Sequence, residues 1–183
     1  EPIPPIRTAR FGGAIAWSTA LAAAVAVCLV AIVVLFQSVE KDILTVTYED
    51  GILYRQGNEE AVELLDGDRF PAGTFVIEDA DGFAEIEFDD GTQMSLQGET
   101  ELDFGIVDGQ KFLYVNKGRL LCAATPQPAG KPIQIRTGTA EIEVLGTVLT
   151  VDSSEDLTDL SVVEGEVKFR RVVDGQAVLV SAE

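Results

Sequence analysis

The feature that most constrains this chain is a run of 29 residues without a charged side chain, from Phe11 to Val39. Its most apolar part, Ala14 to Phe36, would be ~35 Å long as a helix that rises ~1.5 Å per residue. That length crosses a hydrocarbon core of ~30 Å with some tilt. Lipid offers the backbone no hydrogen-bond partner, so a spanning segment of this kind must be helical. The sequence therefore predicts one transmembrane α-helix over residues 11–39.

Two other kinds of segment share part of this pattern. A cleaved signal peptide has a shorter apolar stretch and a cleavage site of small residues, and the sequence from Phe36 to Glu40 is not such a site. A lipoprotein signal needs a small residue before its cysteine, whereas Val27 precedes Cys28. Both alternatives are weaker than a membrane-spanning helix.

The charges on either side of the run predict its orientation. Arg7 and Arg10 precede the helix, and acidic residues follow it from Glu40 onward. Basic flanks stay in the cytoplasm, and an aromatic side chain such as Trp17 anchors a helix at the interface. We therefore expect a cytoplasmic stub of residues 1–10 in a bacterial inner membrane, a helix over 11–39, and residues 40–183 on the periplasmic side.

Small side chains gather in the first half of the predicted helix. They are Gly12, Gly13, Ala16, Ala20, Ala23 and Ala24. Small residues let helices approach closely, so this face is a candidate for packing against a neighbouring membrane helix. Alanine is common in such helices, and an ordinary composition explains the same pattern.

The pattern changes period after Ile43, where short β-branched runs alternate with turn residues. The segments 83–88 and 140–144 alternate apolar and acidic residues, which indicates strands with one buried face. The other predicted strands are 43–48, 59–65, 74–77, 92–96, 101–106, 112–115, 119–123, 133–136, 148–151, 159–163, 166–170 and 177–180. About a dozen short strands predict an all-β sandwich, a jelly roll or a β-solenoid-like domain over residues 40–183.

Six Asp-Gly pairs occur among these strands, and each is a strong signal for a β-hairpin turn. They are Asp50-Gly51, Asp66-Gly67, Asp81-Gly82, Asp90-Gly91, Asp108-Gly109 and Asp174-Gly175. The sequence Asp89-Asp90-Gly91-Thr92 is superficially similar to a protease aspartate motif. Its order of glycine and threonine is wrong for that motif, so a hairpin turn is the better interpretation.

Charge argues against several kinds of partner. The chain has 31 acidic and 13 basic residues, and only Glu1, Arg7 and Arg10 precede the helix, so residues 40–183 carry a net charge of −19. Such a surface repels the phosphates of nucleic acids and of anionic lipids. It serves solubility, or it offers an acidic face to a basic partner.

The inventory of reactive residues predicts no catalytic, cofactor or metal site. The chain has no histidine, which removes the commonest general base and transition-metal ligand. Cys28 and Cys122 would lie at different depths, so we expect no internal disulfide and a buried thiol at Cys122. Asp79 and Asp81 have the spacing of a calcium loop without its later glutamate, which leaves at most a weak surface site.

An ordered series of motifs over residues 62–182 resembles the exported domain of FecR-type proteins. The series comprises Leu65-Asp66-Gly67-Asp68, Phe70-Pro71-Ala72-Gly73-Thr74, Asp81–Thr92, Thr100-Glu101-Leu102, Lys117-Gly118-Arg119-Leu120, Pro126-Gln127-Pro128, Val144-Leu145-Gly146-Thr147 and Val162–Val167. The resemblance implies one membrane helix and an exported β domain. It also implies signalling, in which the exported domain senses an outer-membrane receptor and the cytoplasmic part controls a sigma factor.

The ten residues before the predicted helix are too few to bind a sigma factor. On that ground the first expectation is a non-catalytic accessory or structural subunit of a larger membrane complex, for example a photosynthetic or respiratory one. Its partners would be other membrane subunits, contacted through the helix and the β domain. The alternative is a FecR-type transmembrane signal transducer or anti-sigma regulator whose cytoplasmic domain lies outside this sequence.

Overall fold

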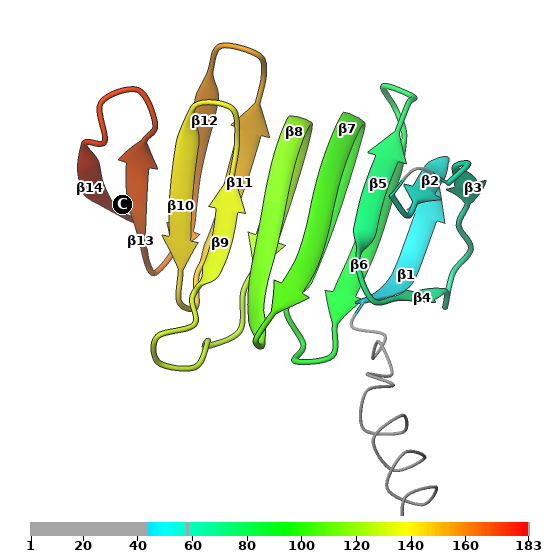
Figure 1. Ribbon diagram of the computed structural model, residues 1–183, viewed down its shortest axis with the longest axis horizontal. Coiled ribbons are helices and arrows are strands. Elements are labelled where there is room, and N and C mark those ends of the chain that lie inside the picture. Colours follow the sequence, from blue (N-terminus) through cyan, green and yellow to red (C-terminus); the bar gives the residue numbers. More distant parts are fainter. Residues whose placement is uncertain (1–43, 58, 183) are drawn as a thin grey trace, which may run out of the picture. The chain divides into compact units, whose positions relative to one another are not determined.

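The computed structural model describes residues 44–57 and 59–182, and these residues form 14 β-strands (Figure 1). No helix in this described part is long and apolar enough to cross a membrane. The predicted helix over 11–39, its packing face and its anchors lie outside the described residues and stay predictions. The all-β prediction is confirmed for the described part of the chain.

The strands follow one another closely along the chain. In order they are β1 (Leu44–Asp50), β2 (Ile52–Arg55), β3 (Val62–Glu63), β4 (Arg69–Phe70), β5 (Gly73–Ile77), β6 (Phe83–Phe88), β7 (Gln93–Val107), β8 (Gln110–Ala123), β9 (Ile133–Arg136), β10 (Ala140–Val144), β11 (Val148–Ser153), β12 (Thr158–Glu164), β13 (Glu166–Arg171) and β14 (Ala177–Ser181). Strands β7 and β8 are by far the longest, and they organise the fold.

All strands belong to one continuous sheet that is folded into two facing layers. The first layer has the order β3-β2-β5-β7-β8-β9-β10-β13-β14, and the second has the order β4-β1-β6-β7-β8-β11-β12. The end of β7 and the start of β8 lie in the first layer, and their other halves lie in the second. Strands β8 and β9 run parallel, while the other described pairs are antiparallel. Figure 1 shows β9 and β10 in front of β11 and β12.

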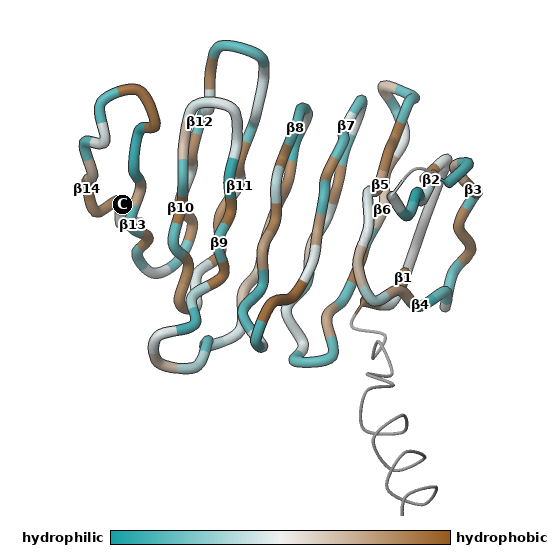
Figure 2. The backbone as a smooth tube through the Cα atoms, in the orientation of Figure 1, coloured by the Kyte–Doolittle hydropathy of each residue, from teal (hydrophilic) through white to brown (hydrophobic). Residues whose placement is uncertain are grey.

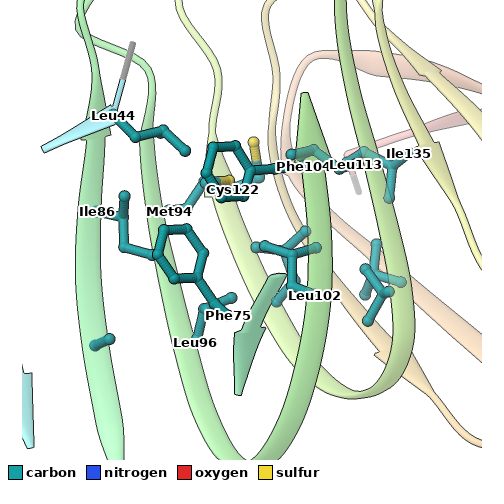
Figure 3. Packing of buried hydrophobic residues seen from close by; sticks show 14 of the residues in the cluster. Leu44, Phe75, Ile86, Met94, Leu96, Leu102, Phe104, Leu113, Cys122 and Ile135 are labelled. Carbon is teal, nitrogen blue, oxygen red and sulfur yellow. The ribbon is translucent and has the colours of Figure 1, made fainter. Parts of the chain in front are cut away.

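Alternating side chains fill the space between the two layers. Strands such as β10 and β11 bury every second residue, as expected for strands with one wet face. Figure 2 shows this alternation as brown and teal bands along the strands. In Figure 3, Phe75, Leu102 and Phe104 of the first layer meet Met94 and Leu96 of the second. Within the first layer, the rings of Phe75 and Phe104 stack with their centroids 4.6 Å apart. Buried residues of both layers belong to one hydrophobic cluster, so the core of the described domain is continuous across both layers.

The two long strands pass from one layer to the other at a tight bend. The backbone of Gly118 has a φ of +93°, and a Cβ atom there would lie 2.2 Å from Oγ1 of Thr100. Thr100 is buried, donates its hydroxyl hydrogen to the carbonyl of Gln97 at 2.7 Å, and accepts the N–H of Arg119 at 3.0 Å. Only glycine adopts this conformation without strain and leaves room for the threonine. The contact between Thr100 and Gly118 therefore holds the bend.

The sequence predicted where most strands lie but not how long they are. The expected strands 92–96 and 101–106 are parts of the single strand β7, and 112–115 and 119–123 are parts of β8. Each pair is joined because β7 and β8 stay paired on both sides of the bend, with register shifts between Gln97 and Glu101 and between Glu101 and Leu102. The short strands β2 and β4 were not predicted, and the expected strand 59–65 shrinks to β3.

The expectation that every Asp-Gly pair closes a hairpin was wrong for half of them. The pairs at 90–91, 108–109 and 174–175 do join strands that pair with each other. The pairs at 50–51, 66–67 and 81–82 join strands that lie in different layers and do not pair. Five of these glycines have positive φ: Gly51, Gly67, Gly91, Gly109 and Gly175. They include both kinds of pair, so the same turn chemistry can lead the chain either to a paired strand or to the other layer.

Replacing Gly118 by alanine tests the bend. We expect Gly118→Ala to lower the free energy of unfolding by more than about 2 kcal/mol, because it combines backbone strain with a clash against Thr100. The matched control is Gly130→Ala, where φ is +77° and nothing lies within 4 Å of the added atom; it should cost only about 1 kcal/mol. Urea unfolding of both variants gives the comparison, and equal losses would contradict the account.

Candidate functional site

A partly buried polar cluster, which we call the clasp, joins the two layers at the end opposite the bend. It consists of Asp90, Thr92, Lys111, Thr125 and Gln127. The ammonium group of Lys111 donates hydrogen bonds to Oδ2 of Asp90 at 2.5 Å and to Oε1 of Gln127 at 2.8 Å. It also lies 5.4 Å from the ring centre of Phe88. This lysine is buried, and a buried charge is stable only when it is paired in this way.

The other polar groups of the clasp form hydrogen bonds with one another. Nε2 of Gln127 donates to Oδ2 of Asp90 at 3.1 Å and to the carbonyl of Thr125 at 2.8 Å. The backbone N–H of Thr92 donates to the second carboxylate oxygen of Asp90 at 3.1 Å, which shapes the β6–β7 turn. The Thr92 hydroxyl, fully buried, lies 3.1 Å from that of Thr125. A polar network that is satisfied in this way rigidifies the elements that it joins.

The positions of these residues explain what the clasp does. Asp90 precedes β7 and Thr125 follows β8, and both positions lie at the ends of strand halves in the second layer. Lys111 is the second residue of β8 and lies in the first layer. Strands β7 and β8 therefore form a bent, U-shaped pair whose ends lie at the clasp and whose midpoints lie at the bend. The ion pair between Lys111 and Asp90 connects the two layers at the open end of this pair.

Electrostatics show that the clasp is held in its charged form. Partial burial by itself raises the pKa of Asp90, but hydrogen bonds from Lys111, Gln127 and Thr92 outweigh it and lower that pKa from 3.8 to about 2. Nearby, burial raises the pKa of the Cys122 thiol to about 12, so the thiol stays protonated at neutral pH. Reactive cysteines are thiolates, and the free thiol of Cys122 is therefore a core side chain, as predicted.

The loop after β8 packs closely against the turn between β10 and β11. A Cβ atom on Gly146 would lie 3.2 Å from Cα of Pro126, so the glycine allows the two backbones to touch. The N–H of Gln127 donates to the carbonyl of Leu145 at 2.7 Å, and the N–H of Ala124 donates to that of Thr147 at 3.0 Å. These bonds hold the backbone that carries the Gln127 side chain into the clasp.

The arrangement offers binding surfaces more readily than catalytic groups. Lys111 is charged, paired and buried, so it is not a free base or nucleophile. The described residues contain no group of three or more possible acidic, cysteine or histidine metal ligands. Asp79 and Asp81 share a turn in which the N–H of Gly82 donates to the carbonyl of Asp79, and the described part of the chain adds no third acid to them.

A concavity of about 770 Å³ lies at the other end of the sandwich, beside the bend. Its walls come from the bend itself, from the corner at Ala80 and from the β11–β12 hairpin. The charged lining residues are Glu99, Asp152, Glu155 and Asp159 with Lys117 and Arg119, of which Arg119 pairs with Asp152 at 2.7 Å. The concavity therefore carries an excess of two negative charges.

Comparison with known protein families decides the identity of the domain. The FecR protein family matches residues 76–168, which are 93 of the 183 residues of the chain. The chain belongs to the FecR family. The matched part of this FecR domain runs from the end of β5 into β13 and contains both the clasp and the bend. No curated protein matches the sequence.

Two solved structures are similar to this FecR domain. One is a crystal structure at 2.50 Å resolution of a candidate anti-sigma factor from Parabacteroides distasonis ATCC 8503; it has a TM-score of 0.48 and 15% identity over 61% of each chain. The second, at 1.65 Å resolution and under the same description, has a TM-score of 0.46 and 16% identity over 57% of this chain and 58% of its own. The chain thus spans about three fifths of the length of the solved structures that it matches.

The structure gives several FecR motif residues a physical role that the sequence did not reveal. Asp90 and Gln127 meet in the clasp, Gly118 forms the bend, and Gly146 receives the loop at Pro126. Lys111 was not predicted as a site residue. An isolated lysine at the start of an apolar strand, Lys111-Phe112-Leu113, was the signal that could have indicated a buried charge.

Replacing Lys111 by methionine tests the clasp. We expect Lys111→Met to lower the free energy of unfolding at pH 7 by about 1–2 kcal/mol, less than for a fully buried pair, because the Asp90 side chain stays 37% exposed. Lys117→Met is the matched control, since Lys117 is exposed; it should change stability by less than about 0.5 kcal/mol.

The acid dependence of the same variants gives a second readout. The pKa of Asp90 is lower in the folded state, so its stabilisation is present above its ordinary pKa of 3.8 and is lost as the pH falls toward 2. In Lys111→Met this loss between pH 4 and pH 2 should become smaller, while Lys117→Met should follow the unaltered protein. An identical acid profile in all three proteins would show that the ion pair does not stabilise the fold.

Proposed function

We propose that this chain is a FecR-type transmembrane signal transducer whose β domain recognises a partner protein on the exported side of a bacterial inner membrane. The predicted helix would carry the bound state of the domain across the membrane to the control of a sigma factor. The family match over residues 76–168 carries this proposal, since it covers the part of the domain that the clasp and the bend hold together.

The geometry supports recognition as the task of the domain. A clasp at one end and a bend at the other fix the two layers relative to each other, so a surface built on them is presented in one shape. A preorganised surface binds with a smaller entropic cost than a flexible one. The charge of −19 over residues 40–183 would steer basic surfaces toward the domain and keep acidic ones away.

The expected role as an accessory subunit gains no support from the comparisons. Membership of the FecR family favours the regulator, which was the alternative interpretation of the sequence. The two roles differ in what should happen when the protein is lost. A regulator changes which genes are transcribed, whereas a structural subunit changes the composition or stability of a membrane complex.

Deletion of the gene in the organism that encodes it therefore tests the proposal. RNA sequencing should show a small set of transcripts that change together and share one promoter element, and the full-length gene should restore them. A complementing Gly118→Ala variant, whose bend is strained, should restore them less well than the Gly130→Ala control. Unchanged transcripts together with loss of a complex on native gels would contradict the regulator and favour the subunit.

A further inference from the structure

The two flanks of the sandwich end in different ways. On one flank the outermost strands are β3 and β4, which have two residues each. On the other flank the outermost strands are β14, with five residues, and β12, with seven. Proteins usually protect exposed edges with very short strands, lysine, proline or bulges. The first flank is protected by shortness, but the sequence Ala177-Val178-Leu179-Val180-Ser181 of β14 contains none of these devices.

The free edge of β14 presents backbone groups for pairing. The N–H of Arg171 donates to the carbonyl of Gln176, and the N–H of Ala182 donates to that of Gly165, so residues 176 and 182 face β13. Hydrogen-bonding direction alternates along an antiparallel strand. The N–H and C=O groups of Ala177, Leu179 and Ser181 therefore point away from β13, toward the open edge.

The hydrophobic core is also incompletely covered along the outer edge of β14. Val180 packs against the core, and Val178 lies on the same side of the strand because side chains alternate. Even so, Val178 is 56% exposed, and Leu179 on the opposite side is 66% exposed. Figure 2 shows a brown stretch in the connection just after β13, and this connection contains the exposed Val172 and Val173. A further strand beside β14 would cover Val178 and extend the core.

Charge indicates which kind of strand fits. The bases of β13 are already paired: Lys168 with Glu143, Arg170 with Glu141, and Arg171 with Asp174. On β12, by contrast, Asp159 and Glu164 form no ion pair with any described residue. A second copy would bring another domain of net charge −19 to this flank, and like charges of that size repel.

From these observations we propose that β14 is a docking edge for an extended segment of a partner protein, in which apolar residues are flanked by lysine or arginine. The segment adds to the first layer as an antiparallel strand at β14, covers Val178, and places its basic flanks near the acids of β12. This mode of recognition takes affinity from backbone pairing and specificity from alternate side chains. This docking proposal rests on the proposed function and adds the chemistry of the partner. Its test measures peptide binding and not transcription, so the docking proposal and the proposed function can fail independently.

The test uses the full-length chain in detergent and a fluorescent peptide of the order Lys-Lys-Val-Thr-Val-Thr-Val-Lys-Lys. Anisotropy should report binding that weakens at least about tenfold in Leu179→Pro, because proline removes an outward N–H without removing a bond to β13. The matched variant Leu179→Ala keeps that N–H and should weaken binding less than about threefold. Two control peptides, one with glutamate in place of the lysines and one with a central proline, should bind at least about tenfold more weakly than the basic peptide.

A second measurement keeps the proposal decidable if Leu179→Pro does not fold. Hydrogen exchange in the unaltered chain should slow at the amides of Ala177, Leu179 and Ser181 when the basic peptide is added. No binding, unchanged exchange at these amides, or equal binding of the acidic peptide would overturn the proposal. So would concentration-dependent self-association that Leu179→Pro abolishes, because the occupant would then be a second copy.

Discussion

The close contact between Thr100 and Gly118 is the constraint on which the rest of the described structure depends. It lets two long strands turn back on themselves, so that one hairpin supplies neighbouring strands to both layers. Strands β5 and β9 flank this hairpin in the first layer, and β6 and β11 flank it in the second. Without the bend the sheet would continue in one plane, and the apolar faces that now cover each other would be exposed to water.

The clasp holds together the ends of the two strands that the bend leaves free. The bend fixes β7 and β8 at their midpoints, but their ends in the first layer could move away from their ends in the second. Lys111 reaches from the first layer to Asp90 and Gln127 in the second, at the cost of burying a charge. Removing one partner of such a pair leaves an uncompensated charge, so the cluster favours one relative position of the layers. Structural neighbours of the clasp, such as Gly146 against Pro126, extend this rigidity along the same end.

Local patterns in the sequence were sufficient to place most strands, because alternation and turn residues act within a few positions. The segments 83–88 and 140–144 are strands with the predicted buried faces. The pairing of strands was not predictable in the same way. Asp50-Gly51 has the same local chemistry as Asp90-Gly91, with positive φ at both glycines, yet one leads to the other layer and one closes a hairpin. Whether a turn closes a hairpin depends on contacts between distant residues.

In the candidate site, too, local motifs were predictable from the sequence and long-range contacts were not. The FecR motifs were visible in order, but not that Asp90 and Gln127, 37 positions apart, share a hydrogen bond. Lys111 carries no motif signal, because its importance comes from burial, and burial depends on the whole fold. The open edge at β14 was not predictable for a similar reason. Its sequence is that of an ordinary strand, and only the sheet order shows that no described strand pairs with its outer side.

Native-state hydrogen exchange tests most directly the claim that the bent hairpin is the structural centre of the domain. If it is, the paired amides of β7 and β8 around Leu102 and Leu113 should exchange only through global unfolding, with the largest free energies in the domain. The amides of β3, β4 and the outer side of β14 should exchange through smaller openings. Outer strands that stay protected while β7 and β8 exchange by local opening would contradict the account.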